Sequence, residues 1–276
     1  MLMIPQRGDI RVQHNLGTVG SLTIGTTVTT GASTTTKGTP AELIASTDFE
    51  AYFVEIYACD YGVSATASGG CMDILIGSAT ESIIIPNLLF GNCGSVAAHS
   101  TKRWMFPLYI PAGSRIACQA AGERNNATFQ VGICLYGGNG IPPFKTGSKV
   151  TTYGVGTIPA AVAVTPGANG AEGSWTQITA STSEDHHALY PSLHIPVDTA
   201  IGARTYFLDI GLGAATEEEI AQSYIFTTTA AEIVGGPVFR IMPCFNNIPS
   251  GSRISVRLST DLSAIDTPQV AIHAVS

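Results

Sequence analysis

Apolar and polar residues alternate with a period of two along much of the chain. Ile254, Val256 and Leu258, for example, are separated by single polar residues. Because successive side chains of a strand point to opposite faces of a sheet, this alternation predicts a strand with one buried face. The same pattern occurs at residues 52–57, 71–76, 128–135 and 205–210. The chain is therefore predicted to consist mainly of strands, in sheets that have one wet side.

Helical patterns are scarce. Residues 216–223 predict one short helix, with Thr216 as the N-cap and the following glutamates in the first turn. The 30 glycines and 15 prolines leave little room for longer helices. Short strands separated by turn-forming residues, without the strand–helix alternation of parallel sheets, predict an all-β fold.

The second half of the chain repeats the first half. Residues 73–81 return at 209–217 with six identities in nine positions, and residues 110–116 return at 248–254 with six identities in seven. Shorter matches keep the same order at nearly the same spacing: residues 17–19 with 156–158, 45–47 with 180–182, Phe90 with Phe226, and 128–133 with 267–272. A nearly constant spacing of one domain length indicates that a whole domain has been duplicated.

The duplication divides the chain into two domains of the same kind. We predict an N-terminal arm over residues 1–16, a first domain over 17–138, a linker over 139–155 and a second domain over 156–276. Within the first domain, residues 17–40 predict either an arm or an edge strand. About eight short strands in each domain favour a two-sheet antiparallel β-sandwich of the jelly-roll type. An immunoglobulin-like domain is disfavoured because it is shorter, at about 100 residues, and carries a Cys–Trp–Cys framework that is missing here.

Charge is sparse and mainly acidic. Charged residues make up 12% of the chain, about half the usual share, which predicts that much of the surface is buried against other subunits. The net charge is −7, and the largest basic cluster is Lys102–Arg103, so direct nucleic-acid binding is not expected. No apolar run is long enough to predict a membrane span. Pro5, Arg7 and Asp9 interrupt the apolar start, so we expect no secretory signal and synthesis in the cytoplasm.

Two interpretations of the six cysteines remain open. Their spacing does not match a zinc site. They are either small buried hydrophobic residues or partners in disulfides that form after the protein leaves the cytoplasm. Cys59 and Cys71 bracket residues 60–70 and are a candidate pair across two strands, whereas exposed cysteines would link neighbouring subunits. The candidate disulfide cysteines are Cys59, Cys71, Cys93, Cys118, Cys134 and Cys244.

The repeated Ile-Pro-x-Gly-Ser-Arg-Ile motif predicts a type II turn that leads into a strand. In this interpretation the prolines are the second residues of the turns, the glycines lie just beyond them, and the arginines begin the strands on their polar face. A role in stabilising the turn or contacting another subunit is favoured over ligand binding. These candidate residues are Pro111, Gly113 and Arg115 in the first copy, and Pro249, Gly251 and Arg253 in the second.

Candidate catalytic and metal-binding residues are few. Asp73 and Asp209 recur at the same place in both copies and are interpreted as strand aspartates that hydrogen-bond a neighbouring turn. Adjacent His186 and His187 would point to opposite faces of a strand, so residues 184–187 predict a solvated loop instead of a metal site. No recognised catalytic or nucleotide-binding motif is present. We therefore expect no enzymatic activity and no cofactor.

Residues 106–117 (FPLYIPAGSRIA) resemble a turn–strand pattern of virion structural proteins of tailed bacteriophages, and residues 245–254 repeat it more weakly. The resemblance implies jelly-roll domains in a non-enzymatic part of the virion that is present in many copies. A neck or collar sheath, a head decoration protein and a tail-associated protein all fit it. Implied partners are further copies of the chain and virion proteins such as the portal, the connector or the major capsid protein.

The leading hypothesis is thus a tandem jelly-roll virion protein that assembles in the host cytoplasm through strand edges, loops and the N-terminal arm. The alternative is a carbohydrate-binding jelly-roll module of a phage adhesin or tail protein. Such a module needs exposed aromatic rings, and Trp104 and Trp175 do not occupy equivalent places in the two copies. A glycan-cleaving enzyme and a cupin-like metal domain are less favoured.

Overall fold

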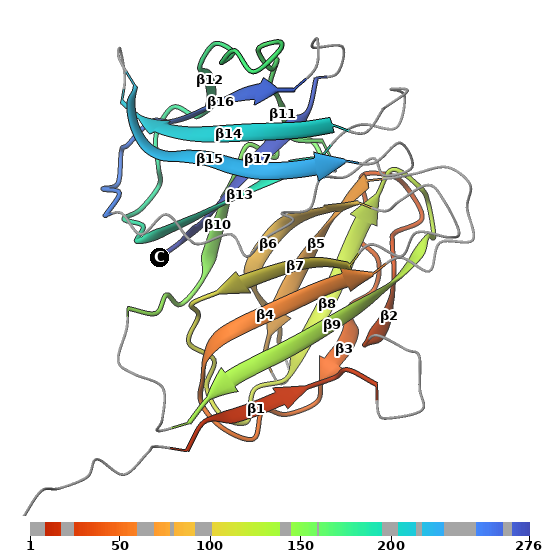
Figure 1. The fold of residues 1–276 in the computed structure, drawn as a ribbon. Helices are drawn as coiled ribbons and strands as arrows, with labels where there is room; N and C mark the ends of the chain where they lie inside the picture. Colours follow the sequence, from red (N-terminus) through yellow and green to blue (C-terminus); the bar gives the residue numbers. More distant parts are fainter. Residues whose placement is uncertain are drawn as a thin grey trace, which may run out of the picture.

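The computed structural model of the chain describes residues 9–17, 25–59, 69–77, 80–91, 101–138, 145–158, 160–194, 204–213, 217–228, 247–261 and 267–276 (Figure 1). These residues form strands, isolated bridges and turns, and there is no helix among them. The described part of the chain thus also contains no helix that is long and apolar enough to cross a membrane. The all-β prediction is confirmed.

Two antiparallel sheets form the first domain (Figure 1). One sheet has the strand order β1-β9-β4-β7, with β2 also pairing with β9, and the other has the order β3-β8-β5-β6. The strands are β1 (Arg11–His14), β2 (Thr26–Thr29), β3 (Ala41–Ile44), β4 (Ala51–Cys59), β5 (Gly69–Ile76), β6 (Ser82–Gly91), β7 (Thr101–Phe106), β8 (Ile116–Gly122) and β9 (Thr128–Gly137).

The second domain repeats this arrangement. Its first sheet contains β17, which pairs with β10, β11 and β13, and its second sheet has the order β12-β16-β14-β15. The strands are β10 (Val150–Tyr153), β11 (Val162–Ala163), β12 (Thr176–Thr179), β13 (Ala188–His194), β14 (Arg204–Leu212), β15 (Glu218–Thr228), β16 (Ile254–Thr260) and β17 (Gln269–Val275). The expected counterpart of β7 falls at residues 239–244, which lie outside the described residues.

In each domain the chain passes back and forth between the two sheets, which gives the topology of a jelly roll. Strand β3 lies in one sheet, β4 in the other, the β5–β6 hairpin in the first again, and β7 in the second. Strands β8 and β9 then enter the two sheets between earlier strands. The structure is therefore two tandem jelly-roll domains, as the alternation and the duplication predict.

The two domains share their strand register as well as their topology. Asp73 on β5 lies opposite Gln119 on β8, and Asp209 on β14 lies opposite Arg257 on β16. A register shift after Met72 on β5 returns at the corresponding place on β14. Strand irregularities of this kind follow from local sequence and sheet geometry, so their repetition shows that the duplication preserved backbone detail.

Each sandwich has its own hydrophobic core. In the second domain, Ile254, Val256 and Leu258 are fully buried in one cluster, as the alternation predicts. In the first domain, Val54 and Ile56 on β4 belong to the other large cluster. Burial of such side chains contributes roughly 1.5–3 kcal/mol each, and this is the main force that holds the sheets together.

The two domains also pack against each other. Strands β10 and β13 of the second domain lie against β6, and Thr152 on β10 donates a hydrogen bond to the carbonyl oxygen of Pro86 on β6. The Phe106 ring at the end of β7 lies 4.7 Å from the Tyr190 ring on β13, measured between centroids. Val275 and Ala188 of the second domain also join the hydrophobic cluster of the first. The join is thus a hydrophobic interface.

Two segments predicted to lie outside the domains contain strands that pair with them. Part of the predicted N-terminal arm, Arg11–His14, is β1, an edge strand that pairs with β9. Part of the predicted linker, Val150–Tyr153, is β10, which pairs with β17 in the corresponding way. Both segments are too short to show a clear alternation, so only the neighbouring long strand reveals them. Residues 26–29 form the edge strand β2, one of the two alternatives predicted for residues 17–40.

The predicted helix at residues 216–223 is wrong. Glu218–Thr228 forms β15, an edge strand that pairs with β14. The glutamates that suggested a helix N-terminus instead form ion pairs with arginines: Glu219 pairs with Arg257 on β16, and Glu217 pairs with Arg253 just before β16. The glutamates are therefore clustered because they form ion pairs with arginines distant in the chain, and not because they stabilise the dipole of a helix.

Candidate functional site

Two of the repeated sequence motifs touch each other in both domains. Thr47 is buried, donates its hydroxyl to the Pro111 carbonyl at 2.7 Å and accepts the Ser114 amide at 2.9 Å. In the second domain Thr182 makes the same two bonds, to the Pro249 carbonyl at 2.8 Å and from the Ser252 amide at 3.1 Å. These motifs are therefore parts of one structural clasp, which explains their joint repetition.

The turn in this clasp differs from the predicted one by a single position. Gly113 and Gly251 have φ values of 80° and 87°, which a type II turn requires at its third residue. The prolines are accordingly the first residues of the turns, and the amide of Ser252 donates to the carbonyl of Pro249 at 3.2 Å. Proline's common place at the second position suggested the wrong register, whereas glycine's tolerance of positive φ decides it.

The arginines of the motif bind glutamates of their own domain. Arg115 forms ion pairs with Glu42 on β3, at 2.8 Å, and with Glu81 just before β6. Arg253 forms the corresponding pair with Glu217 just before β15. Each arginine thus joins the motif to a neighbouring strand of its sheet and stabilises the turn within the domain.

Asp73 is also held by residues of its own domain. Its carboxylate accepts Lys37 Nζ at 2.9 Å, Gln119 Nε2 at 2.8 Å and the amide of Asn87 at 2.8 Å. The side chain is buried, so these three donors compensate for its removal from water. Asn87 has a positive φ of 50°. Asp73 is thus a strand aspartate as predicted, but its hydrogen bonds reach the neighbouring strands β6 and β8 and Lys37 instead of a neighbouring turn.

The second domain holds the equivalent Asp209 with a different cation. Arg257 on β16 donates from Nε to Asp209 at 2.9 Å and also pairs with Glu172 and Glu219. The backbone register of the adjoining loop places Glu172 where the first domain has Lys37. The positive charge has thus moved from a loop to a strand, while the buried aspartate has stayed.

The described cysteine side chains are buried thiols. Cys71, Cys118 and Cys134 are all free, and burial raises the pKa of each. Cys59 and Cys71, the predicted candidate pair, lie on β4 and β5 in different sheets, and Cys71 is a free thiol in this structure. The side chains of Cys59, Cys93 and Cys244 lie outside the described residues.

The histidine patch is not a solvated loop. His186 and His187 are 1% and 8% exposed, just before β13. The backbone of His186 pairs with Ile248, and its Nε2 atom lies 2.8 Å from the hydroxyl of Tyr153. Burial lowers the pKa of both histidines. Among the described residues, no group of three or more His, Cys, Asp or Glu side chains is arranged to hold a metal ion.

The largest difference between the domains lies on one pair of sheet faces. We call the side of sheet β1-β9-β4-β7 that points away from its core the first outer face, and the corresponding side of β10, β17 and β13 the second outer face. The first domain packs on the second outer face, where Ala188, Ser192 and His273 are buried. In the described part of the chain, no strand of the second domain packs closely on β1, β4 or β9.

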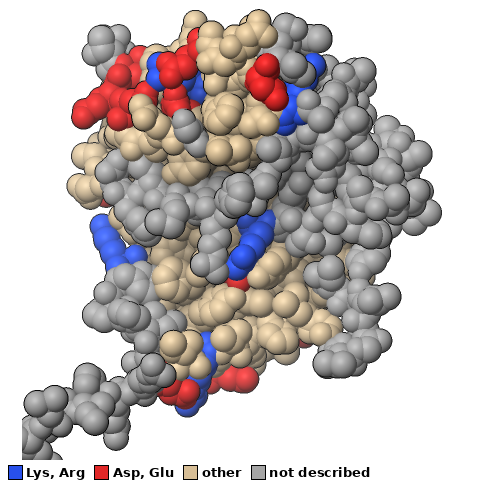
Figure 2. Space-filling view, in the orientation of Figure 1, with Lys and Arg blue, Asp and Glu red and all other residues tan. Residues whose placement is uncertain are grey.

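Larger side chains cover the first outer face. Phe53 and Tyr57 on β4 and Tyr136 on β9 are partly exposed there. Glu55 lies between them, fully buried, paired with Arg103 and accepting the Tyr136 hydroxyl. Figure 1 shows this sheet broadside, and the parts of it that are not grey in Figure 2 are mostly uncharged.

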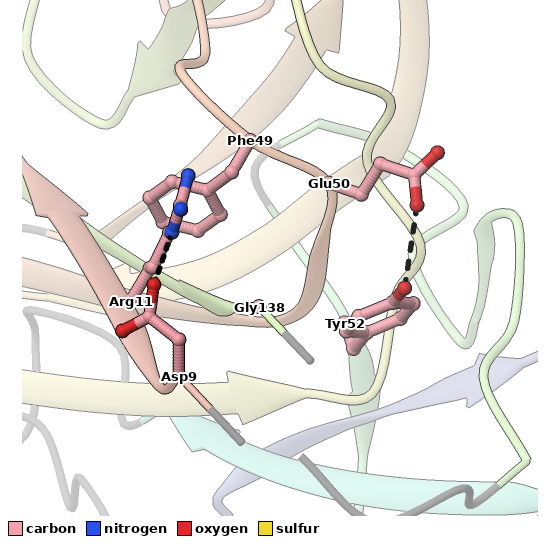
Figure 3. Close-up of a pocket in the computed structure, with 6 residues that line it drawn as sticks. All are labelled: Asp9, Arg11, Phe49, Glu50, Tyr52 and Gly138. Carbon is pink, nitrogen blue, oxygen red and sulfur yellow. Dashed lines mark hydrogen bonds and ion pairs between the residues drawn. The ribbon is translucent and has the colours of Figure 1, made fainter. Parts of the chain in front are cut away.

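A pocket of about 270 Å³ lies at the end of this sheet, where β1 and β4 begin and β9 ends (Figure 3). We call it the rim pocket. Glu50 accepts hydrogen bonds from the hydroxyls of Tyr109, at 2.9 Å, and Tyr52, at 3.3 Å. The two tyrosine rings are 6.0 Å apart and tilted by 41°. The lining residues are Asp9, Arg11, Phe49, Glu50, Tyr52 and Gly138.

Sequence reasoning did not identify the rim pocket. Residues 49–52 span the start of β4 at Ala51, and Tyr109 lies nearly 60 residues later, next to the Ile-Pro-x-Gly-Ser-Arg-Ile motif. The signal that was available is the loss of aromatic residues from the second copy, in which Asp185, His187 and Asn247 stand at the places of Glu50, Tyr52 and Tyr109. An aromatic residue that one copy has and the other lacks is not needed for the shared fold.

The chain shows only distant likenesses to known proteins. No protein-family model matches the sequence, and no curated protein sequence matches it. Solved structures with a distantly similar arrangement of the backbone include PNGF-II, with 8% identity and a TM-score of 0.39. The likeness covers 98% of this chain and 65% of that one.

Two further structures of this kind are the tandem CBM22 domains of Paenibacillus barcinonensis Xyn10C and infectious bursal disease virus, Gx strain. The CBM22 pair has 9% identity and a TM-score of 0.28 over 98% of this chain and 92% of that one. The virus protein has 12% identity and a TM-score of 0.25 over 97% and 72% of the two chains. The fold assignment rests on the strand topology.

Proposed function

We propose that this chain is a non-enzymatic structural protein of a tailed-phage virion, present in many copies as a neck or collar sheath or a capsid decoration. It assembles with further copies and with virion proteins such as the portal, the connector or the major capsid protein. The observation that carries the proposal is the contrast between the two outer faces. One packs against the first domain, and on the equivalent face of the first domain no strand of the second domain packs closely on β1, β4 or β9 in the part of the chain that the structure describes.

Three further features support this proposal. The resemblance to phage virion proteins lies in the Ile-Pro-x-Gly-Ser-Arg-Ile clasp, which is present in both domains. Charged residues are only 12% of the chain, which suits a protein that buries surface against neighbours. Phe53, Tyr57 and Tyr136 also supply the aromatic area that is enriched at the centres of protein interfaces.

The proposal makes the first outer face the main contact between subunits. A stable interface buries about 1,200–2,000 Å² in total, and a sheet face with three large aromatic side chains offers an apolar centre for such a contact. The edge strand β1 extends this surface, since Val12 is 51% exposed beside Tyr136. The two domains would then act as a spacer of defined length between neighbours on the particle.

Assembly can be tested by native mass spectrometry of the purified chain over a range of concentrations. We expect oligomers of the wild type at micromolar concentration. The variant carrying Phe53→Ala and Tyr57→Ser has at these positions the residues of the second outer face, Ala188 and Ser192, and should be at least tenfold weaker in assembly. Cross-linking mass spectrometry of the wild type should place intermolecular links on β1, β4 and β9.

The matched control removes exposed apolar side chains elsewhere. Ile83 on β6 and Ile225 on β15 are 47% and 40% exposed, so Ile83→Ser with Ile225→Ser should leave assembly unchanged. A wild-type chain that stays monomeric, or a Phe53→Ala, Tyr57→Ser variant that assembles normally, contradicts the role of this face. Quantitative mass spectrometry of purified phage particles that encode the chain tests the location, and absence from them overturns it.

The alternative function, carbohydrate binding through the tryptophans, is not supported by their environments. Trp104 is 4% exposed and belongs to the first core. Trp175 has the guanidinium of Arg257 4.6 Å from its ring centroid and packs closely against Gly211 of β14. Trp104 is thus buried in a core, and the Trp175 ring is already in contact with a guanidinium.

A further inference from the structure

We propose that the rim pocket binds one unit of a neutral saccharide. This site is distinct from the tryptophans and lies at the end of the sheet whose outer face is the assembly surface proposed above, without including Phe53, Tyr57 or Tyr136. It combines aromatic rings, fixed carboxylates and a concave shape at one place on the first domain (Figure 3). The argument rests on the contacts of Glu50, on the charge of the lining and on a comparison with the second domain.

Glu50 fixes the two aromatic residues. Both of its carboxylate oxygens accept phenol hydroxyls, one from Tyr109 and the other from Tyr52. These bonds hold the rings at a set tilt and keep the carboxylate in place. Tyr109 does not line the pocket itself, but it is 37% exposed and lies beside the lining residues Glu50 and Tyr52, where its ring can extend the site. Holding side chains in their bound arrangement lowers the entropy cost of binding.

Sugars suit such a site for two chemical reasons. The C–H groups on one side of a pyranose form an apolar face that packs on an aromatic ring, while the hydroxyls at its edge donate to carboxylates. The pocket volume of about 270 Å³ is slightly below the range of ~300–1,000 Å³ for sites of drug-sized ligands. One sugar unit therefore matches it better than an extended chain lying along a groove.

The charge of the lining selects a neutral sugar. Asp9 and Glu50 are acidic, and the only cation among the lining residues, Arg11, already pairs with Asp9 at 2.7 Å. A uronic or sialic acid would bring a further negative charge next to two carboxylates. That repulsion disfavours acidic sugars, whereas a neutral hexose or N-acetylhexosamine adds hydroxyl donors without it.

The second domain shows that the fold does not require these residues. At the corresponding end of the second domain, the carboxylate of Asp185 accepts a hydrogen bond from the amide of Ser250 at 2.7 Å and so stabilises a turn. His187, in the place of Tyr52, is buried, and Asn247 replaces Tyr109. The same scaffold is thus built without an aromatic pair, so the tyrosines of the first domain need an explanation other than folding.

Saturation-transfer NMR of the full chain with the methyl glycosides of glucose, galactose, mannose and N-acetylglucosamine tests the proposal. We expect at least one of them to bind, and methyl glucuronide to bind at least tenfold more weakly. Tyr109→Ala and Tyr52→Ala should each weaken binding about tenfold or more. Glu50→Gln, which keeps the shape of the side chain, should weaken it by a smaller factor.

The control is the Phe53→Ala, Tyr57→Ser variant, which alters the first outer face but none of the lining residues. It should bind the sugar normally while losing assembly, and Tyr109→Ala should assemble normally while losing the sugar. Absence of binding by all four neutral glycosides at millimolar concentration overturns the proposal. Preference for glucuronide, or unchanged binding by both tyrosine variants that melt like the wild type, overturns it equally.

Discussion

The two outer faces have the same strand register but differ in what packs on them. The first domain packs on the second outer face, whereas no strand of the second domain in the described part of the chain packs closely on β1, β4 or β9. Phe53 lies opposite Tyr136 on the first, and Ala188 lies opposite Val275 at the corresponding place on the second. On the second face, Ala188 and Ser192 stand where the first face has Phe53 and Tyr57, and the large ring of Tyr190 between them packs against Phe106 of the first domain. On the first face, Glu55 stands at the place of Tyr190 and pairs with Arg103. Divergence at a few positions thus decided which face became internal.

The polar groups on the two faces also differ in how they are satisfied. On the second face, His273 is fully buried and its two ring nitrogens lie 2.8 Å from the hydroxyls of Thr152 and Ser192. On the first face, the buried charge of Glu55 is balanced by Arg103, which is 39% exposed. A sealed interface requires every polar group to be satisfied within it, whereas a face at the surface can hold an ion pair that water reaches on one side.

The largest expected effect comes from breaking the join between the domains. Phe106 is fully buried and contacts Tyr190, so Phe106→Ala should lower the free energy of unfolding by about 3–5 kcal/mol. Urea unfolding gives the magnitude, and hydrogen-exchange mass spectrometry should show faster exchange in β13 and β17 as well as in β4 and β7. Phe226→Ala, in the core of the second domain only, should leave exchange in β4 and β7 unchanged.

The repeated aspartates Asp73 and Asp209 are paired with cations at different positions, and substitutions can convert one arrangement into the other. Arg257→Gln puts the residue of the first domain into the second and leaves Asp209, Glu172 and Glu219 without this cation, which should cost about 3 kcal/mol. Adding Glu172→Lys recreates the arrangement of Lys37 and Gln119 and should restore more than half of the loss. Urea unfolding measures both variants. A double variant as unstable as the single one would show that the two arrangements are not interchangeable.

Acid should destabilise the second domain more than the first. Burial lowers the pKa of His273 to about 3, whereas an unfolded histidine titrates near 6.5. The stability that neutral His273 contributes is therefore complete above pH 6.5 and is lost as the pH falls toward 3, by about 1.4 kcal/mol per unit. At pH 5 this amounts to about 2 kcal/mol, and the lowered pKa values of His186 and His187 act in the same direction.

Hydrogen exchange at pH 7 and pH 5, corrected for the intrinsic rates, separates the two domains. His273→Cys, which carries the residue of the corresponding first-domain position, should be less stable at pH 7 but should lose less stability on acidification. Equal acid sensitivity of both domains in the wild type would contradict this assignment.

The smallest effects should be equal in the two domains. Thr47→Val and Thr182→Val each remove one donated and one accepted hydrogen bond in the same clasp, and each should cost about 1–2 kcal/mol. Urea unfolding of the two single variants measures both costs. A difference larger than about 1 kcal/mol would mean that the clasp is not equally important in the two copies.

The fold could be predicted largely from local patterns, and the candidate site could not. The alternation at Ile254, Val256 and Leu258 predicts a strand and its buried face, because side-chain direction in a strand depends only on position. Burial of His186 and the strand at Glu218–Thr228 escaped prediction, since each depends on residues distant in the chain. The meeting of Glu50 with Tyr109 likewise needs two separate loops to come together.

The strands, the duplication and the repeated turn are encoded locally, because they follow from periodicity and from identity at matched positions. The edge positions of β1 and β10, the different cations of Asp73 and Asp209, and the packing of the first domain on one outer face arise from folding in three dimensions. Those outcomes depend on distances between side chains far apart in the chain. Two copies of one scaffold therefore acquired different surfaces through a few substitutions whose partners lie in other strands or in the other domain.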